Sequence, residues 1–202
     1  MQRIHAVLFH QGAPALGGGA LRGEPGLAAL REVSAACLSP AGQLQVATAL
    51  EVLEALEARM GELRHQLLAE ARHLAGAKVL AERLYGVGPV AALAMTCWLG
   101  GAGRFSSSRQ AVRFAGLDIT VSSSDRKGPP GKLSRQGPPV LRWAVYEAAK
   151  THARTSAPDH RYYAAVKDRK NSKRACLSEA RKILRQAHHI LAELGDDALA
   201  AA

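Results

Sequence analysis

The chain has few cysteines and no recognisable metal-binding motif. Cys37, Cys97 and Cys176 are odd in number and far apart, with no CxxC pair and no histidine at ligand spacing. This pattern argues against a disulfide scaffold or zinc finger and fits reduced thiols in a cytosolic protein. The pair His188-His189 does not indicate a metal site either, because adjacent helical residues point to different faces. We expect no metal ligands and no cofactor in this chain.

The chain also lacks an apolar run long enough to span a bilayer. Its N-terminal stretch, residues 1–10, is short and broken by His5 and His10, so we predict a helical fragment rather than a signal peptide. No membrane partner is expected. The predicted location is the cytoplasm, in association with the nucleoid.

Positive charge is abundant and unevenly placed. The formal net charge is +10. Residues 1–103 carry 8 Lys/Arg against 8 Asp/Glu, residues 104–185 carry 19 against 6, and residues 186–202 carry none against 3. A basic block of this kind predicts a surface that binds nucleic-acid phosphates. The alternative is a solvated basic surface without a partner.

Glycine, proline and apolar spacing divide the chain into three predicted parts. Residues 12–26 are rich in Gly, Ala and Pro, which indicates an irregular link. Ser39-Pro40 is a helix start, since serine caps free N–H groups and proline suits the first helical position. We therefore predict an irregular N-terminal remnant over 1–38, a coiled-coil helix over 39–76 and a helical domain over 77–202.

The second part carries the clearest periodicity. Its apolar positions alternate in steps of three and four, with only Glu70 interrupting them: Val46, Ala49, Leu53, Leu56, Met60, Leu63, Leu67 and Leu74. This heptad pattern favours a coiled-coil arm that pairs with another copy or with an upstream helix. The alternative is a long helix packed within its own domain. Homo-oligomers through residues 46–74 are therefore expected.

Beyond residue 77 the sequence predicts an all-α fold with one extended loop. Helices are expected at about 79–84, 89–99, 107–115, 139–153 and 173–194. Only residues 117–121 have strand-like composition.

Two segments in this region suggest phosphate binding. The first is the turn Leu84 to Pro89, in which Gly86 can take a positive φ and Gly88 lets a backbone approach closely. Pro89 then opens a helix whose free N–H groups could hold an anion. This predicts a helix-hairpin-helix that grips the phosphodiester backbone; an ordinary helix-to-helix turn is the alternative.

The second segment is a polar loop containing Ser122-Ser123-Ser124-Asp125. A serine attacks phosphorus only if a base takes its proton and cations neutralise the phosphoryl oxygens. The available cations are Arg126, Lys127, Lys132, Arg135 and Arg142. No carboxylate cluster lies beside the loop to hold Mg²⁺. Composition alone therefore favours a phosphate-binding loop over a catalytic one.

The order of these motifs resembles a known family. Tyr-Gly-Val-Gly-Pro at 85–89 is followed by Arg-Phe-Ser-Ser-Ser-Arg-Gln-Ala-Val-Arg-Phe-Ala-Gly-Leu at 104–117, the serine loop, Leu-Ser-Arg-Gln-Gly at 133–137 and Leu141-Arg142. Residues 80–194 are similar to the C-terminal transposase domain of a bacterial insertion-sequence family that includes Piv-type DNA invertases and bridge-RNA-guided recombinases. The heptad arm fits the coiled coil that joins the two halves of such proteins.

The resemblance implies specific roles. The family's nucleophilic serine, which becomes covalently linked to DNA, falls on Ser124, with Ser123 and Ser134 as fallbacks. Arg135 and Arg142 correspond to basic positions that hold DNA phosphates. The expected nucleic-acid contacts are Gly86, Gly88, Arg126, Lys127, Lys132, Ser134, Arg135 and Arg142. The partners implied are DNA and a guide RNA.

Three departures from the family pattern matter. Asp125 stands where a glycine usually follows the serine, and Gln136-Gly137-Pro138 replaces Arg-Gly-Asn. The family's nuclease-like domain has an Asp, Glu, Asp, Asp site for Mg²⁺, whereas residues 1–38 contain only Glu24 and Glu32. We therefore expect a truncated transposase, inactive alone, that takes part in DNA transposition. The alternatives are a non-catalytic nucleic-acid-binding relic that dimerises through its coiled coil, and a structural adaptor.

Overall fold

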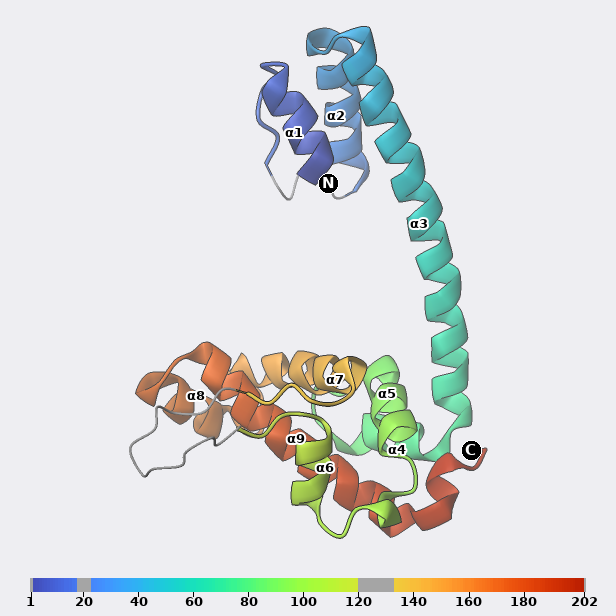
Figure 1. Ribbon diagram of the computed structural model, residues 1–202, viewed down its shortest axis with the longest axis vertical. Coiled ribbons are helices and arrows are strands. Elements are labelled where there is room, and N and C mark those ends of the chain that lie inside the picture. The colour runs from blue at the N-terminus through green and yellow to red at the C-terminus, as the bar shows by residue number, and fades with distance from the viewer. Residues whose placement is uncertain (1, 18–22, 120–132, 202) are drawn as a thin grey trace. The chain divides into compact units, whose positions relative to one another are not determined.

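The computed structural model describes residues 2–17, 23–119 and 133–201 of the chain (Figure 1). The chain divides into two compact units, Met1–Arg64 and His65–Ala202. Ser122, Ser123, Ser124, Asp125, Arg126, Lys127 and Lys132 lie outside the described residues. Their predicted roles therefore stay predictions.

The first unit is built from α1 (Gln2–His10), α2 (Glu24–Cys37) and the first part of α3 (Pro40–His73). In both α1 and α3, apolar residues four positions apart lie on one helix face. Ile4 and Leu8 of α1 therefore share one core with Val46 and Leu50 of α3. Leu30 of α2 is fully buried in the same cluster. This is a small core that joins three helices.

The prediction of a helical fragment at the start of the chain is confirmed by α1, but the irregular segment expected over 1–38 contains a second helix as well. Pro25 lies in the first turn of α2, where its missing N–H costs nothing. Leu27, Leu30 and Val33 then repeat at steps of three and pack into the core. The short apolar stripe therefore indicates the helix, whereas the glycine-rich composition of the preceding residues indicated irregular structure.

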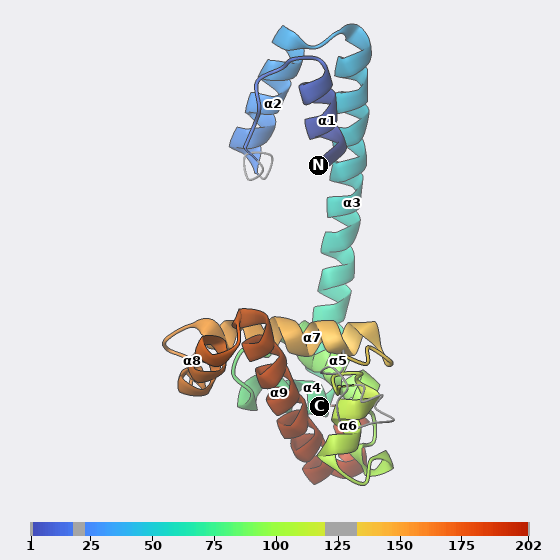
Figure 2. The same cartoon turned by 60° about the vertical axis from the view of Figure 1, so that its left-hand side comes forward.

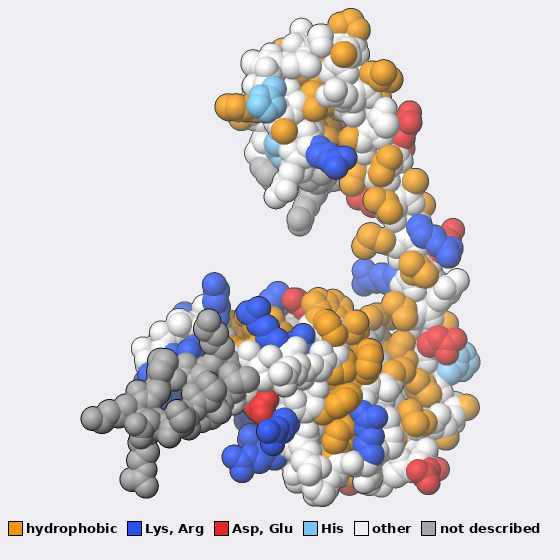
Figure 3. All heavy atoms as spheres, in the orientation of Figure 1, with side chains coloured by type: hydrophobic (Ala, Val, Ile, Leu, Met, Phe, Trp, Pro, Cys, Tyr) orange, Lys and Arg blue, Asp and Glu red, His pale blue; other side chains and the backbone are white. Residues whose placement is uncertain are grey.

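The heptad segment lies in one helix, α3, up to His73, and its last position, Leu74, has extended backbone between α3 and α4. Of its early heptad positions, Val46 is buried against the upstream helices, and Ala49 and Leu53 are partly buried in the same cluster. Later positions are exposed, with Leu56 at 55% and Met60 at 67%. Apolar side chains are visible along α3 in Figure 3. Pairing of this exposed stretch with another copy stays a prediction.

The second unit contains the remaining helices, and α9 (Ser172–Leu194) is its central element. The elements before it are α4 (Ala75–Arg83), α5 (Pro89–Leu99), η1 (Ala102–Arg104), α6 (Ser108–Phe114), α7 (Pro139–Lys150), η2 (Thr151–Ala153) and α8 (His160–Arg169). The last element is η3 (Gly195–Leu199). Helix α9 packs against α4, α5, α6, α7 and α8, as Figures 1 and 2 show. Ala180, Ile183, Leu184, Ala187 and Leu191 form its buried stripe.

The all-α prediction is confirmed. In the described parts of the chain no β-strand forms; Ile119 and Leu133 make one isolated antiparallel bridge, and Leu74 and Ala201 make another. Helix α8 was not predicted, because only Tyr163 and Val166 are buried on an otherwise polar segment. Within the described residues, no helix is long and apolar enough to cross a membrane.

Candidate nucleic-acid interface

The serine loop begins and ends in a short paired stem made of residues 116–119 and 133–136. Ser134 donates its backbone N–H to the carbonyl of Asp118 at 3.0 Å, and Arg135 donates to the carbonyl of Gly116 at 3.1 Å. The bridge between Ile119 and Leu133 continues the pairing. The two ends of the loop are therefore held together, and residues 117–119, the described part of the segment with strand-like composition, lie in this pairing.

Two glycines allow the stem to pack against the end of α6. Gly116 has a φ of +67°, and a Cβ there would lie 2.8 Å from the backbone N of Gln136. Gly137 has a φ of +147°, and a Cβ there would overlap the carbonyl oxygen of Phe114. A side chain at either position would combine backbone strain with a clash against backbone, which cannot move aside cheaply.

Arg142 of α7 connects the same two segments. Its guanidinium donates to the carbonyl of Gly137 at 2.8 Å and to the carbonyl of Ala115 at 3.2 Å, and the side chain is half-buried. These bonds satisfy a carbonyl at the end of α6 and one just before α7. Arg142, predicted as a phosphate contact, therefore has a structural role in this fold.

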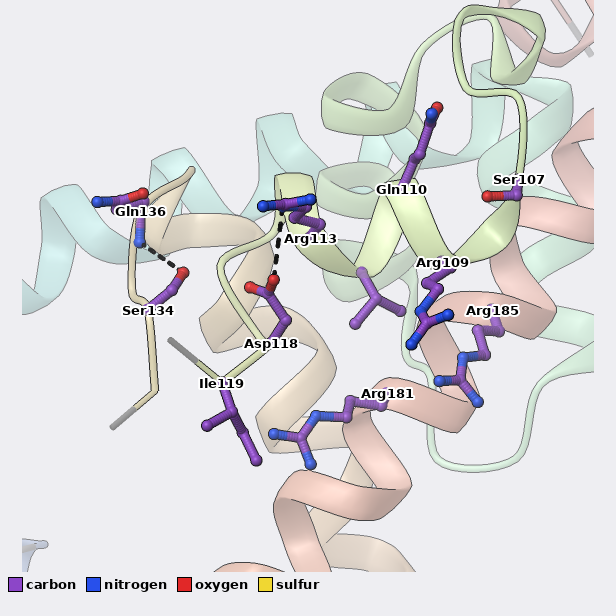
Figure 4. Close-up of a pocket in the computed structure, with 11 residues that line it drawn as sticks. Ser107, Arg109, Gln110, Arg113, Asp118, Ile119, Ser134, Gln136, Arg181 and Arg185 are labelled. Carbon is purple, nitrogen blue, oxygen red and sulfur yellow. Dashed lines mark hydrogen bonds and ion pairs between the residues drawn. The ribbon is translucent and has the colours of Figure 1, made fainter. Parts of the chain in front are cut away.

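A basic pocket of about 780 Å³ opens beside the stem (Figure 4). Arg109 and Arg113 reach it from α6, and Arg181 and Arg185 reach it from α9. The arginines of each pair are four residues apart, so each pair shares a helix face. Ser107, Gln110, Val112, Asp118, Ile119, Ser134 and Gln136 complete the lining. We call these eleven residues the arginine pocket.

The arginine pocket has an excess of positive charge. Asp118 is the only carboxylate in its lining, and its Oδ2 lies 3.7 Å from Nε of Arg113. Arg181 donates Nε–H to the carbonyl of Leu117 at 2.7 Å, which fixes its guanidinium beside the stem. Burial, and then the nearby charges of Arg185 and Arg174, lower the pKa of Arg181. An anion in the pocket would relieve this repulsion.

Ser134 is the one predicted nucleic-acid contact among the described residues that lines the pocket. Its Oγ accepts a hydrogen bond from the backbone N–H of Gln136 at 3.3 Å. Arg135 is exposed, has a φ of +54° and is not part of the pocket lining. The structure thus brings Ser134, but not Arg135 or Arg142, to the arginines of α6 and α9.

The glycine turn lies between α4 and α5, as the sequence predicted. Gly86 has a φ of +77°, and a Cβ there would overlap Oγ1 of Thr151 and lie 2.9 Å from the carbonyl oxygen of Ala148. Gly88 is exposed and directly precedes Pro89 of α5, and a Cβ at this position would have no atom within 4 Å. Gly86 is therefore explained by packing against α7 and η2, and Gly88 is the glycine with space for a ligand.

Sequence reasoning did not single out Arg181 and Arg185 as site residues. Their i, i+4 spacing next to the buried stripe of α9 was a usable signal, but they lie at least 45 residues from the stem in sequence, so the connection was not apparent. Arg109 and Arg113 were noticed only as part of a motif. Tertiary packing of α6 against α9 is what places the four side chains together.

Residues 79–164 match the family described as Transposase IS116/IS110/IS902 family. The matched segment includes the glycine turn, α5, α6, the stem and α7, together with most of α4 and the first half of α8; it ends before α9. No curated protein matches the chain. Over these 86 of its 202 residues, the chain is similar to the transposases of the IS116/IS110/IS902 family.

Proposed function

We propose that the second unit binds DNA phosphates through the arginine pocket during transposition. The observation that carries this proposal is the convergence of Arg109, Arg113, Arg181 and Arg185 around one pocket with a single carboxylate, at the base of the serine loop. Guanidinium groups donate in pairs to phosphate oxygens, which suits them to this ligand. The same binding would hold the protein on the nucleoid.

In this proposal, Ser124 is the nucleophile of the family reaction. Its Oγ would attack a DNA phosphorus and form a serine–phosphate ester. At the same time the bond between this phosphorus and one DNA oxygen would break, and that oxygen would take a proton and leave as a hydroxyl. Ser124 lies in sequence between the two segments of the stem, which is why we connect it with the arginine pocket in this proposal. The resemblance assigns Mg²⁺ chemistry to a nuclease-like domain, and residues 1–38 with two carboxylates do not supply its four-carboxylate site.

A binding function without cleavage is the second candidate. It is favoured by the composition of the arginine pocket, because Asp118 is ion-paired with Arg113 and no other lining residue of the pocket is a general base. In that case the chain would hold DNA and dimerise through α3, where Leu56, Met60, Leu63 and Leu67 are each more than 40% exposed.

Phosphate contacts do not by themselves distinguish DNA from a guide RNA, so we include RNA as a second ligand of the arginine pocket in this proposal.

The DNA-binding proposal is tested by salt dependence. Duplex affinity is measured by fluorescence anisotropy for the wild type and for Arg109→Gln/Arg185→Gln, both exposed positions of the pocket. The slope of log K against log salt should fall in magnitude by about 1–2, since each lost phosphate contact removes about 0.9. The control is Arg64→Gln/Arg72→Gln, which removes the same charge from exposed positions outside the arginine pocket and outside the glycine turn. Equal losses in both double variants would reject a specific role of the pocket, and competition with RNA would identify the preferred nucleic acid.

Catalysis is tested with Ser124→Ala. If Ser124 is the nucleophile, the variant retains duplex binding and forms no covalent protein–DNA adduct in the presence of Mg²⁺ and a nuclease-like domain of the family supplied separately. Ser156→Ala is the matched control, because Ser156 is an exposed serine outside the arginine pocket. A wild-type chain that binds DNA but never forms the adduct under these conditions would favour the binding function.

A further inference from the structure

A second polar cluster lies away from the arginine pocket, where η2, the start of α8 and α9 meet. His152 belongs to η2, Asp159 precedes the first residue of α8, and Glu179 is in α9. Each residue offers one ligand atom, and the three atoms lie within 4.8 Å of one another. The three residues are 7 and 20 positions apart in sequence, so no spacing motif announces them.

Glu179 is the most unusual member of the cluster. Its side chain is completely buried, and neither carboxylate oxygen has a hydrogen-bond partner. The nearest basic atom is Nδ1 of His152 at 3.7 Å, on a side chain that is only 4% exposed. Burial raises the pKa of Glu179 to about 6, with Lys182 opposing the shift and Asp159 adding to it. A buried carboxylate without donors requires a compensating proton or cation.

The hydrogen bond of His152 to the backbone indicates which of its two ring nitrogens carries the hydrogen and which one faces the Glu179 carboxylate without it. Nε2 lies 3.4 Å from the carbonyl oxygen of Tyr85, and a carbonyl only accepts, so Nε2 carries the hydrogen. In the neutral imidazole, Nδ1 then presents a lone pair toward Oε2 of Glu179. Two lone pairs that face each other in a buried site repel unless a positive charge lies between them.

We propose that His152, Asp159 and Glu179 bind a divalent metal ion, with Zn²⁺ as the best match. Nδ1 of His152 and one oxygen from each carboxylate would supply three ligands, and water would supply the fourth. One imidazole and two carboxylates form a donor set that suits Zn²⁺, whereas Mg²⁺ prefers oxygen ligands alone. The Nε2–H bond to Tyr85 matches the backbone contact that commonly orients a metal-bound histidine.

The surroundings are consistent with such a site. Oδ1 of Asp159 contacts Nζ of Lys182 at 2.7 Å, which leaves Oδ2 available as a ligand. The two carboxylates balance the charge of the ion. Asp159 is partly exposed, with 29% of its side chain accessible, and so provides an entry path. The ion would tie η2 and the start of α8 to α9, a structural role separate from DNA binding.

The experiment uses the full chain without a histidine tag, in which Cys37 and Cys97 are replaced by serine to remove the two exposed thiols. After treatment with EDTA and dialysis, Zn²⁺ is titrated against a chromophoric chelator, and bound metal is counted by elemental analysis. We expect one tight equivalent. Zn²⁺ at about 100 times its Kd should raise Tm by about 5–10 °C. Co²⁺ in place of Zn²⁺ should give the visible absorption of a tetrahedral site without thiolate charge-transfer bands.

The key variant is Glu179→Gln, with Glu193→Gln as control, because Glu193 is an exposed carboxylate on the same helix. Glu179→Gln should bind Zn²⁺ at least 10-fold more weakly and lose the Tm increase, while Glu193→Gln behaves as the parent chain. Asp159→Asn, at a partly exposed position, should weaken binding as well and serves if Glu179→Gln does not fold. The proposal is overturned if the parent chain binds no Zn²⁺ or if its affinity is unchanged in both site variants.

Discussion

The two glycines of the turn between α4 and α5 offer a matched pair of substitutions. Gly86→Ala places a methyl group at a φ of +77°, where it overlaps Thr151 and approaches the carbonyl oxygen of Ala148 to 2.9 Å. Gly88→Ala places the same methyl group at a φ of −79°, with nothing within 4 Å. Both variants replace a glycine hydrogen with a methyl group, at positions two residues apart. A difference in stability between the two variants therefore reflects the local backbone conformation and packing at each position.

The expected magnitudes follow from these geometries. A non-glycine residue in the left-handed region costs about 1–2 kcal/mol, and forcing extra volume against packed backbone costs about 1–3 kcal/mol. Gly86→Ala should therefore lower the free energy of unfolding by about 2–5 kcal/mol. Gly88→Ala fits its backbone conformation and reduces the freedom of the unfolded chain, so it should be neutral or stabilise by up to about 1 kcal/mol.

Thermal unfolding followed by circular dichroism measures both effects. For a unit of this size, Gly86→Ala should lower Tm by about 6–20 °C, and Gly88→Ala should leave Tm within a few degrees. Duplex binding at a temperature where both variants are folded then tests the predicted phosphate contact, which should weaken for Gly88→Ala. Equal Tm values for the two variants would refute the packing role that the structure gives to Gly86.

Three further predictions concern the stem and the buried carboxylate. Arg142→Met should lower the free energy of unfolding by about 1–3 kcal/mol in urea titrations, because the carbonyls of Ala115 and Gly137 lose a charged donor; an unchanged midpoint would exclude this structural role. Gly137→Ala should be destabilising by a similar or larger amount, since its methyl group overlaps the carbonyl oxygen of Phe114, and hydrogen exchange of the stem amides should rise. In the metal-free chain, burial raises the pKa of the Glu179 carboxyl from 4.5 to about 6. The free energy of unfolding should therefore be highest below pH 4.5 and should fall by about 2 kcal/mol as the pH rises through 6. Glu179→Gln should remove this pH dependence in unfolding titrations at several pH values.

The sequence predicted the helices with strong apolar periodicity and missed those without it. Helix α9 is marked by a regular stripe that includes Ile183, Leu184 and Leu191, and its predicted range agrees with the structure. Helix α8 buries only Tyr163 and Val166, so its local pattern is too weak to distinguish it from a polar loop. Local propensity predicts an element only when enough of one face is buried.

The candidate site was predictable in part for a similar reason. Ser134 is near the stem in sequence and was identified from its motif, whereas Arg181 and Arg185 reach the same pocket from a helix far along the chain. For Arg142 the residue type suggested a phosphate contact, and the structure adds a role that the residue type did not suggest, because its Nη1 donates to the carbonyls of Ala115 and Gly137. Which carbonyls need a donor is decided by how α6 and α7 meet, and no single-sequence pattern encodes that.

The isolated bridge between Leu74 and Ala201 has a practical consequence. Ala75 also donates its backbone N–H to the carbonyl of Ala200 at 3.1 Å, so within the second unit the start of α4 lies next to residues 200–201. A chain whose ends are adjacent can be joined by a short linker and opened elsewhere. A circular permutant that links 201 to 74 and starts in the turn at Gly88 would keep α9 central, while its new termini would lie at the turn that we assign to phosphate binding.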